Sequence, residues 1–112
     1  MKCKLLLFCL LASCGSQERE VWTSVAMDGR PRSGFEIVTQ DGRVVAGFDG
    51  CNRWAVSAQK DMIDIEQEEC ASDPLRAAYW ALVRDGGAKP VRQERQLLLR
   101  RSGHQGVFIP EQ

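Results

Sequence analysis

The chain has 112 residues, with 15 Lys and Arg, 15 Asp and Glu, and a single His. This length allows one domain at most, because independent folding units usually hold about 100–150 residues. A hydrophobic fraction of 44% and a charged fraction of 27% are typical of a globular protein and exclude general disorder. The formal net charge of zero argues against nucleic-acid binding, and one His excludes a multi-histidine metal site.

Residues 1–13 have the features of a secretory signal peptide. Lys2 and Lys4 give a basic start, and an apolar run follows that is far shorter than the roughly 20 residues needed to span a bilayer. The next feature, Leu11-Ala12-Ser13-Cys14, resembles the lipobox of bacterial lipoproteins, whose cysteine is diacylated before cleavage. The alternative is a buried N-terminal helix in a cytosolic protein. The combined pattern predicts a mature chain that begins at a lipidated Cys14.

The predicted lipid places the protein in the bacterial cell envelope. Several acyl chains on one residue anchor a protein firmly, and Gly15 after the cysteine favours the outer membrane by resemblance to sorted lipoproteins. Cleavage removes two lysines and leaves 13 basic against 15 acidic residues, so the attachment to the membrane is the lipid and not a basic patch. We expect residues 14–20 to be a lipidated tether and residues 21–112 to be one domain facing the periplasm.

The cysteine count agrees with this compartment. Cys3 and Cys9 leave with the signal peptide and Cys14 takes the lipid, so Cys51 and Cys70 remain. An even pair in an oxidising compartment favours a disulfide, which on the loop-entropy model contributes about 3 kcal/mol. The alternative is a pair of reactive thiols, although the sequence contains no Cys-x-x-Cys.

Short apolar runs alternate with turn residues from Val21 onward, which predicts an antiparallel sheet. The expected strands span residues 21–27, 34–40, 43–49, 52–58, 62–66, 90–94, 97–101 and 106–109. We also predict a turn at residues 58–61. Asp41-Gly42 is the strongest hairpin signal. A two-residue loop fixes the register of a hairpin, and the predicted pairs, all facing the core, are Phe35 with Phe48, Ile37 with Ala46, and Thr39 with Val44.

The pattern changes to a helical period after residue 72. Asp73 is a suitable N-cap and Pro74 a suitable first helical residue, while Gly86 and Gly87 end the segment. One apolar stripe follows at helical spacing, formed by Leu75, Ala78, Tyr79, Leu82 and Val83. The predicted fold class is therefore α+β, mainly antiparallel β, with a curled sheet or partial barrel and one amphipathic helix packed against it.

The segment Gly47-Phe48-Asp49-Gly50-Cys51-Asn52 and the elements around it resemble the META domain, also called the HslJ-like family. That family opens with a Trp-containing strand, continues through a Gly-x-x-Gly-Cys-Asn hairpin to a second Cys and a helix, and closes with Leu-rich and Phe-containing strands. The elements that match in this chain are Trp22, Gly47, Gly50, Cys51, Asn52, Cys70, the Leu75–Val83 helix, Leu97, Leu99 and Phe108.

The resemblance covers residues 21–109. It implies an antiparallel sheet curled into a partial barrel, in a bacterial envelope protein linked to envelope stress, antibiotic tolerance, and secretion or motility. It implies no agreed biochemical activity.

Few residues point to chemistry. Five acidic residues could form a carboxylate pair or bind Ca²⁺: Asp49, Asp64, Glu66, Glu68 and Glu69. Charged residues on a strand usually lie on its solvent-exposed face, however, and the cluster lacks the glycines of a calcium loop. His104 is expected in a solvated loop. We expect Gly50-Cys51-Asn52 to be a structural corner.

Trp80 is the main candidate interface residue. It lies off the apolar stripe of the predicted helix, with Arg76 and Arg84 on its side, and an exposed Trp often marks an interface. The alternative is that it packs under a neighbouring loop. Trp22 and Trp54 are expected in the core.

These features predict a monomeric, lipid-anchored binding or accessory module that is not an enzyme, needs no cofactor or metal, and binds a protein or small ligand but no nucleic acid. One alternative is an inhibitor of a cell-wall hydrolase, since such inhibitors share this architecture. A second is a thiol enzyme that uses Cys51 or Cys70.

Overall fold

The computed structural model describes residues 19–57, 59 and 62–111 and is mostly antiparallel β-sheet. The predicted signal peptide, Cys14, residues 15–18 of the predicted tether and three of the four residues of the predicted turn at 58–61 lie outside the described residues. The last two residues of the predicted tether, Arg19 and Glu20, begin a strand instead. The strands are β1 (Arg19–Met27), β2 (Arg30–Pro31), β3 (Glu36–Gln40), β4 (Arg43–Phe48), β5 (Arg53–Val56), β6 (Met62–Asp64), β7 (Val91–Gln93), β8 (Gln96–Arg101) and β9 (His104–Pro110).

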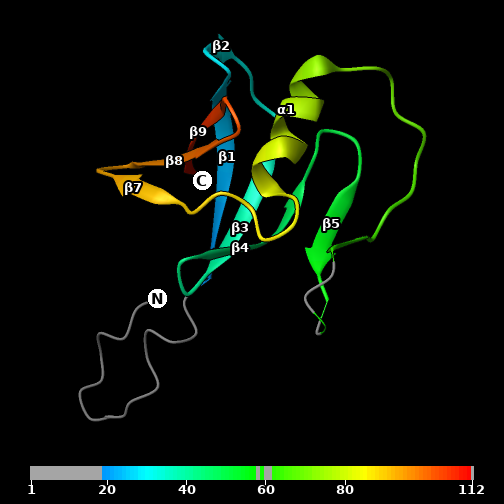
Figure 1. Cartoon of the computed structure of the whole chain (residues 1–112), viewed down its shortest axis with the longest axis horizontal. Coiled ribbons are helices and arrows are strands. Elements are labelled where there is room, and N and C mark those ends of the chain that lie inside the picture. Colours follow the sequence, from blue (N-terminus) through cyan, green and yellow to red (C-terminus); the bar gives the residue numbers. More distant parts are fainter. Residues whose placement is uncertain (1–18, 58, 60–61, 112) are drawn as a thin grey trace.

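The strands form one antiparallel sheet in the order β6-β5-β4-β3-β1-β9-β8-β7, with β2 paired to β1. The sheet is curled without closing, and helix α1 (Pro74–Val83) packs against it. Figure 1 shows α1 in front of the central strands. The predicted fold class is thus confirmed. No helix among the described residues is long and apolar enough to cross a membrane.

The core lies between α1 and the inner face of the sheet. Trp22 and Trp54, each 1% exposed, belong to it as predicted. The remaining large buried side chains come from β1, β3, β8, β9, the residue before β3 and the helix: Met27, Phe35, Ile37, Tyr79, Leu82, Leu97, Leu99 and Phe108.

Helix α1 forms as the sequence predicts. Asp73 has an extended backbone and its carboxylate accepts a hydrogen bond from Leu75 N (3.0 Å), which satisfies one free amide of the first turn. Pro74 follows the cap, where its missing N–H costs nothing. Four residues of the predicted stripe are buried, and Leu75 packs against the core from its margin.

The two central hairpins turn through two residues with positive φ. Asp41 and Gly42 have φ of 54° and 80°, and Ser102 and Gly103 have φ of 54° and 82°. These values match the mirror-image turns that suit the twist of paired strands. The predicted Asp41-Gly42 hairpin is confirmed, and the final hairpin turns at Ser102-Gly103.

The predicted register of the β3–β4 hairpin is correct only next to its turn. Thr39 pairs with Val44, but the next pair is Val38 with Ala46, so Val45 is an extra residue that forms a β-bulge. Beyond the bulge, Gly47 lies opposite Ile37. The predicted pairs Phe35 with Phe48 and Ile37 with Ala46 are therefore wrong.

Because of the bulge, the residues in the second half of β4 point to the opposite faces of the sheet from those predicted. Ile37 and its partner Gly47 point inward and are buried, whereas Ala46 and Phe48 point outward and are only half-buried. Gly47 is needed because a Cβ there would lie 2.3 Å from Tyr79 Oη and 2.5 Å from the Glu36 carbonyl oxygen. The aromatic core under the hairpin thus occupies the space that a larger inward side chain would need.

Candidate functional site

The corner after β4 is built on a buried carboxylate. Asp49 is 4% exposed, and its Oδ1 accepts hydrogen bonds from Cys51 N (2.9 Å) and Asn52 N (2.6 Å). Gly50, with φ of 90°, allows the chain to turn between them. This geometry makes Gly50-Cys51-Asn52 a structural corner, as the sequence predicts.

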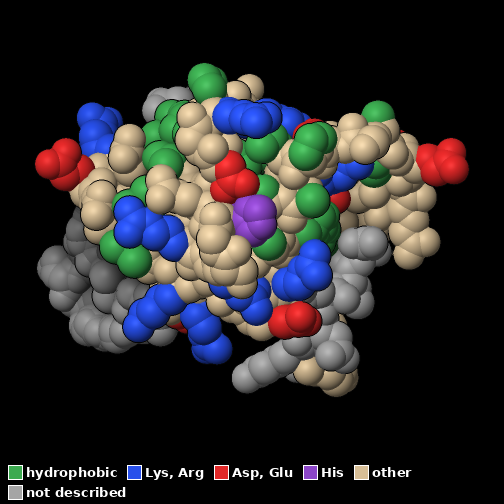
Figure 2. All heavy atoms as spheres, turned by 45° about the horizontal axis from the view of Figure 1, so that its top comes forward, with side chains coloured by type: hydrophobic (Ala, Val, Ile, Leu, Met, Phe, Trp, Pro, Cys, Tyr) green, Lys and Arg blue, Asp and Glu red, His purple; other side chains and the backbone are tan. Residues whose placement is uncertain are grey.

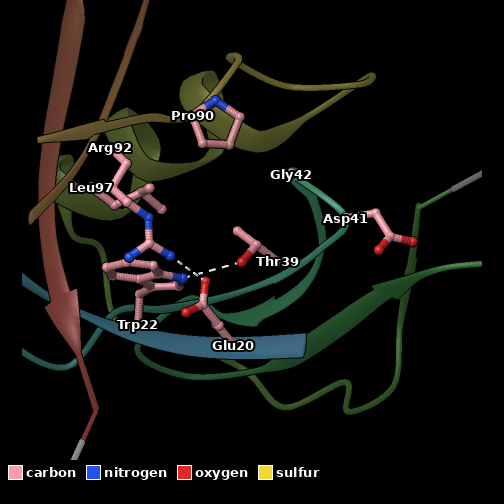
Figure 3. Close-up of a pocket in the computed structure, with 8 residues that line it drawn as sticks. All are labelled: Glu20, Trp22, Thr39, Asp41, Gly42, Pro90, Arg92 and Leu97. Carbon is pink, nitrogen blue, oxygen red and sulfur yellow. Dashed lines mark hydrogen bonds and ion pairs between the residues drawn. The ribbon is translucent and has the colours of Figure 1, made fainter. Parts of the chain in front are cut away.

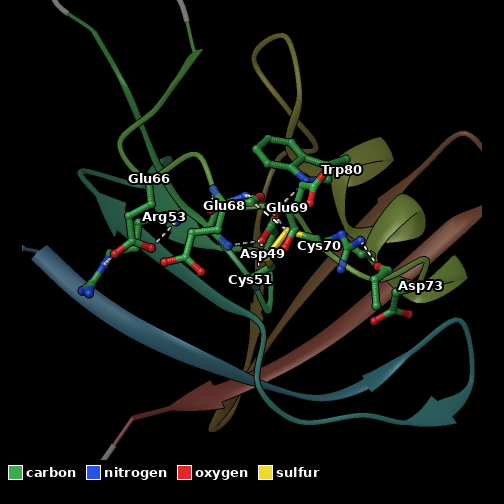
Figure 4. Close-up of a disulfide and its surroundings, with 12 residues drawn as sticks. Asp49, Cys51, Arg53, Glu66, Glu68, Glu69, Cys70, Asp73 and Trp80 are labelled. Carbon is green, nitrogen blue, oxygen red and sulfur yellow. Dashed lines mark hydrogen bonds and ion pairs between the residues drawn. A yellow bond between two sulfur atoms is a disulfide. The ribbon is translucent and has the colours of Figure 1, made fainter.

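A disulfide between Cys51 and Cys70 ties this corner to the loop that precedes α1, and their Cα atoms lie 6.0 Å apart. The Asn52 side chain holds the same loop by two hydrogen bonds, from its Nδ2 to the Glu68 carbonyl (3.1 Å) and from Glu68 N to its Oδ1 (2.8 Å). Figure 4 shows the disulfide beside Asp49 and Trp80. Both cysteines are therefore used structurally.

Trp80 occupies the margin of the core and is half-buried. Its Nε1 donates to Asp49 Oδ2 (2.9 Å), and its ring lies 5.5 Å from that of Trp54 and 5.8 Å from that of Tyr79. The polar atom of the indole is thus used inside the protein. This contact also closes the corner around Asp49 against the helix.

The two arginines expected beside Trp80 contact backbone. Arg76 donates to the Ala71 carbonyl, and Arg84 Nε donates to the Trp80 carbonyl (3.3 Å). The structure therefore places the three predicted interface residues on one helix without joining them into one site. No sequence signal indicated that Asp49 would be the partner of Trp80.

Tyr79 is a fully buried polar residue of the core. Its hydroxyl accepts a hydrogen bond from Trp54 Nε1 (2.8 Å) and donates one to the Glu36 carbonyl (2.6 Å). Burial raises the pKa of Tyr79, so the phenol stays neutral. These bonds attach α1 to both β3 and β5.

The acidic residues that were considered as a possible metal site do not form a cluster in the described part of the structure. Glu66 pairs with Arg53 (3.1 Å), Glu68 and Glu69 are exposed, and the side chain of Asp64 lies outside the described part of the structure. Within the described ranges, no group of three or more His, Cys, Asp or Glu is arranged to hold a metal ion.

His104 lies at the start of β9, where its Nδ1 is 2.8 Å from Asp28 Oδ2. The same carboxylate accepts a hydrogen bond from Gln105 N (2.9 Å). These contacts join the β1–β2 turn to β9. Figure 2 shows the histidine on a face where acidic, basic and hydrophobic side chains are interspersed.

The outer face of the sheet, turned away from α1, carries an apolar row across four neighbouring strands. Val21 pairs with Val38, Val38 with Ala46, and Ala46 with Ala55. Ile65, 62% exposed, and Phe48 lie beside this row in a shallow groove of about 580 Å³. We call these residues the outer apolar face.

Charged groups border the outer apolar face. Glu36 and Glu111 line the groove together, and burial and then the neighbouring Glu111 carboxyl raise the pKa of Glu36. Arg19 and Arg53 also line it. Two neighbouring carboxylates repel each other unless a cation or a proton compensates for their charge.

The outer apolar face was not predicted from the sequence. The only signal for it was that Val38 and Val45 are apolar at positions of β3 and β4 that the alternation predicts to be solvent-exposed. Placing Ala46 and Phe48 beside Val38 required the bulge, which the alternation of residues did not indicate.

A second cavity, of about 200 Å³, opens at the end of the curled sheet where β1 and β3 face β7 and β8. Trp22 and Leu97 form its apolar wall, and Glu20, Thr39 and Arg92 are its polar groups. The Trp22 Nε1 donates to Thr39 Oγ1 (3.1 Å). Figure 3 shows Arg92 above the indole of Trp22, with Asp41 pointing away from the cavity.

Comparisons of the chain with protein-family models, curated proteins and solved structures found no match.

Proposed function

We propose that this protein is a lipid-anchored accessory module of the bacterial cell envelope that binds a partner protein through the outer apolar face and catalyses no reaction. The observation that carries the proposal is the apolar row that crosses four strands on the side of the sheet away from the helix. A contiguous apolar surface with a polar border is typical of a protein interaction site.

The partner that fits this face is an extended segment of an envelope protein with aliphatic side chains and one basic side chain. The aliphatic groups match the row of Val38, Ala46 and Ala55. The basic group matches the pair of carboxyls on Glu36 and Glu111, whose repulsion it would relieve. A META-type role in envelope stress or antibiotic tolerance would then come from assembly with this partner.

The anchor is tested by the mass and location of the mature protein. We expect a chain that begins at Cys14 with a diacylglyceryl group and an N-acyl chain in the outer-membrane fraction. Cys14→Ser should leave an unprocessed precursor. A Cys14→Ser chain with the same mass and location as the parent would contradict the lipid anchor.

The interaction face is tested by a photo-reactive benzophenone amino acid placed at Ala46, compared with one at the exposed Ala77 of α1. We expect a cross-link to an envelope protein only from position 46, lost in Val38→Asp and kept in the control Val91→Asp, which alters an exposed valine of β7. Equal cross-linking from both positions, or none from Ala46, would contradict the proposal.

No specific observation favours either of the two alternative functions. A thiol enzyme needs a free thiolate, and the disulfide occupies both Cys51 and Cys70. Inhibition of a cell-wall hydrolase is a second possible use of the same architecture, and architecture alone does not determine function.

A further inference from the structure

The cavity at the open end of the sheet carries polar side chains at inward-facing positions. Glu20 and Trp22 are two residues apart on β1, so both point to the inner face, and Glu20 pairs with Thr39. Elsewhere the large buried side chains of this face are almost all apolar. The mouth of a β-barrel is a frequent place for a small-molecule site.

Arg92 shows what this cavity accepts. Its Cζ lies 4.9 Å from the centre of the Trp22 ring, and its Nη2 lies 2.5 Å from Glu20 Oε1. An aromatic ring combined with a carboxylate is the usual protein environment for a guanidinium or ammonium group. The chain therefore places its own organic cation in the cavity.

The strand that carries Arg92 is held only weakly to the rest of the sheet. β7 has three residues, all exposed, and lies at the edge of the sheet. The Arg92 side chain is itself 53% exposed and that of Glu20 is 37% exposed, so their ion pair belongs to a class that stabilises proteins little. Withdrawal of Arg92 would uncover the indole and the carboxylate together.

We propose that the Trp22–Glu20 cavity is a binding site for an organic monocation, with a guanidinium or ammonium head on an alkyl stem, and that Arg92 is an internal occupant which a ligand displaces. Trp22 supplies the aromatic surface and Glu20 the counter-charge. Thr39 holds the indole in place through its hydrogen bond to Nε1. This site is on the opposite face of the sheet from the outer apolar face and does not depend on it.

The test follows the indole N–H signal of Trp22 by NMR in the full chain held in detergent micelles, with Trp22→Phe identifying the signal. The probe is ethylguanidinium, and ethylurea is its neutral isostere. We expect ethylguanidinium to shift the signal with at least tenfold higher affinity in Arg92→Gln than in the parent chain. We expect Glu20→Gln, combined with Arg92→Gln, to abolish the shift.

The parent chain provides a readout that needs no variant. Ethylguanidinium should move the Arg92 side-chain N–H signal toward that of a solvent-exposed arginine. The proposal is overturned if the cation fails to shift the Trp22 signal in a folded Arg92→Gln chain, or if ethylurea shifts it equally. Either result would mean that Arg92 and Glu20 only seal the end of the sheet. Glu20→Gln should leave cross-linking from Ala46 unchanged, so failure of this site and failure of the proposed function are distinguishable.

Discussion

The β3–β4 and β8–β9 hairpins both turn through two residues with positive φ, yet they continue differently. The β8–β9 ladder runs without a shift from Arg101–His104 to Leu97–Phe108, whereas the β3–β4 ladder contains the bulge at Val45. The regular hairpin keeps strict alternation, with Leu97, Leu99 and Phe108 buried on the inner face. The bulged hairpin brings a glycine inward and turns Ala46 and Phe48 outward.

Helix α1 makes contacts with both hairpins. Beside β9, a Cβ at Gly106 would lie 3.1 Å from Leu82 Cδ1, so this contact is apolar packing, and Arg101 of β8 adds a hydrogen bond to the Ala81 carbonyl (3.4 Å). On the β3–β4 side the links are polar and run from Tyr79 to the Glu36 carbonyl and from Trp80 to Asp49. The bulge therefore supplies both a polar attachment for the helix and an apolar outer surface.

The largest expected difference in stability between the two hairpins comes from deleting one residue from each. Removing Val45 keeps every residue pair of the β3–β4 ladder, so we expect the chain to stay folded and lose about 1–2 kcal/mol of stability. Removing Leu98 from the regular β8 turns either Leu97 or Leu99 outward, and the loss should exceed about 4 kcal/mol. Urea unfolding of both variants measures the difference, and similar losses would contradict the bulge.

The second comparison substitutes the inward glycine of each hairpin. Gly47→Ala should cost about 3 kcal/mol, because the new methyl group meets the Glu36 carbonyl and the Tyr79 hydroxyl. Gly106→Ala should cost less, about 1–2 kcal/mol, because its nearest neighbours are side-chain atoms of Phe108, Leu82 and Met27 and none is backbone. Chemical denaturation provides both values. A larger loss for Gly106→Ala would mean that the close approach at Gly47 is wrong.

The register of the β3–β4 hairpin was predicted wrongly for a physical reason. For β8 and β9 the sequence predicted only two strands, residues 97–101 and 106–109, and the structure shows them as Gln96–Arg101 and His104–Pro110. In β4 the segment VVAGF is apolar on both sides and suits either register. The choice depends on room for Tyr79 and Trp54, and these contacts with distant residues cannot be read from a local pattern.

The candidate sites were harder to predict than the fold. Cys51 and Cys70 were identified because cysteines can be counted, and Trp80 was placed correctly at the margin of the helix. Its partner Asp49 and the meeting of Glu20 with Arg92 depend on the curl of the sheet. Residues 72 positions apart in the sequence are joined there.

A third prediction tests by pH the ion pair between Arg32 and Asp73, the N-cap of α1, whose Arg32 Nη2 and Asp73 Oδ2 atoms lie 2.7 Å apart. Hydrogen bonds from Arg32 lower the pKa of Asp73 from 3.8 to about 2, against a smaller opposing effect of burial. The unfolded chain then binds more protons between about pH 4 and 2, so this contribution is complete at neutral pH and is lost as the pH falls through that range. We expect it to be about 1–2 kcal/mol.

Asp73→Asn is the matched variant, because Asn also caps helices but carries no charge. In Asp73→Asn the stability should depend less on pH in the acid range than in the parent chain. Asp73→Ala should lose about 1 kcal/mol more stability, because it also removes the N-cap hydrogen bond. Thermal unfolding at several pH values measures both. An unchanged acid limb in Asp73→Asn would contradict the role of the Arg32 pair.

The smallest expected effect concerns the carboxyls at the outer apolar face. Because the pKa of Glu36 is raised, the native chain binds more protons than the unfolded chain above the ordinary pKa of a glutamate. Stability therefore decreases as the pH rises through that window. Glu111→Gln removes a neighbouring charge and should raise the stability at neutral pH by less than about 1 kcal/mol, measured by urea unfolding. A decrease would contradict this repulsion.

The central claim is that the bulge at Val45 turns Gly47 inward and Phe48 outward. The most direct measurement is a set of nuclear Overhauser contacts in the β4 segment. We predict contacts from the Gly47 α-protons to the Trp54 indole N–H, with the Phe48 ring broadened by a soluble paramagnetic agent. Contacts between the rings of Phe48 and Phe35 would contradict the account, because they would place Phe48 in the core.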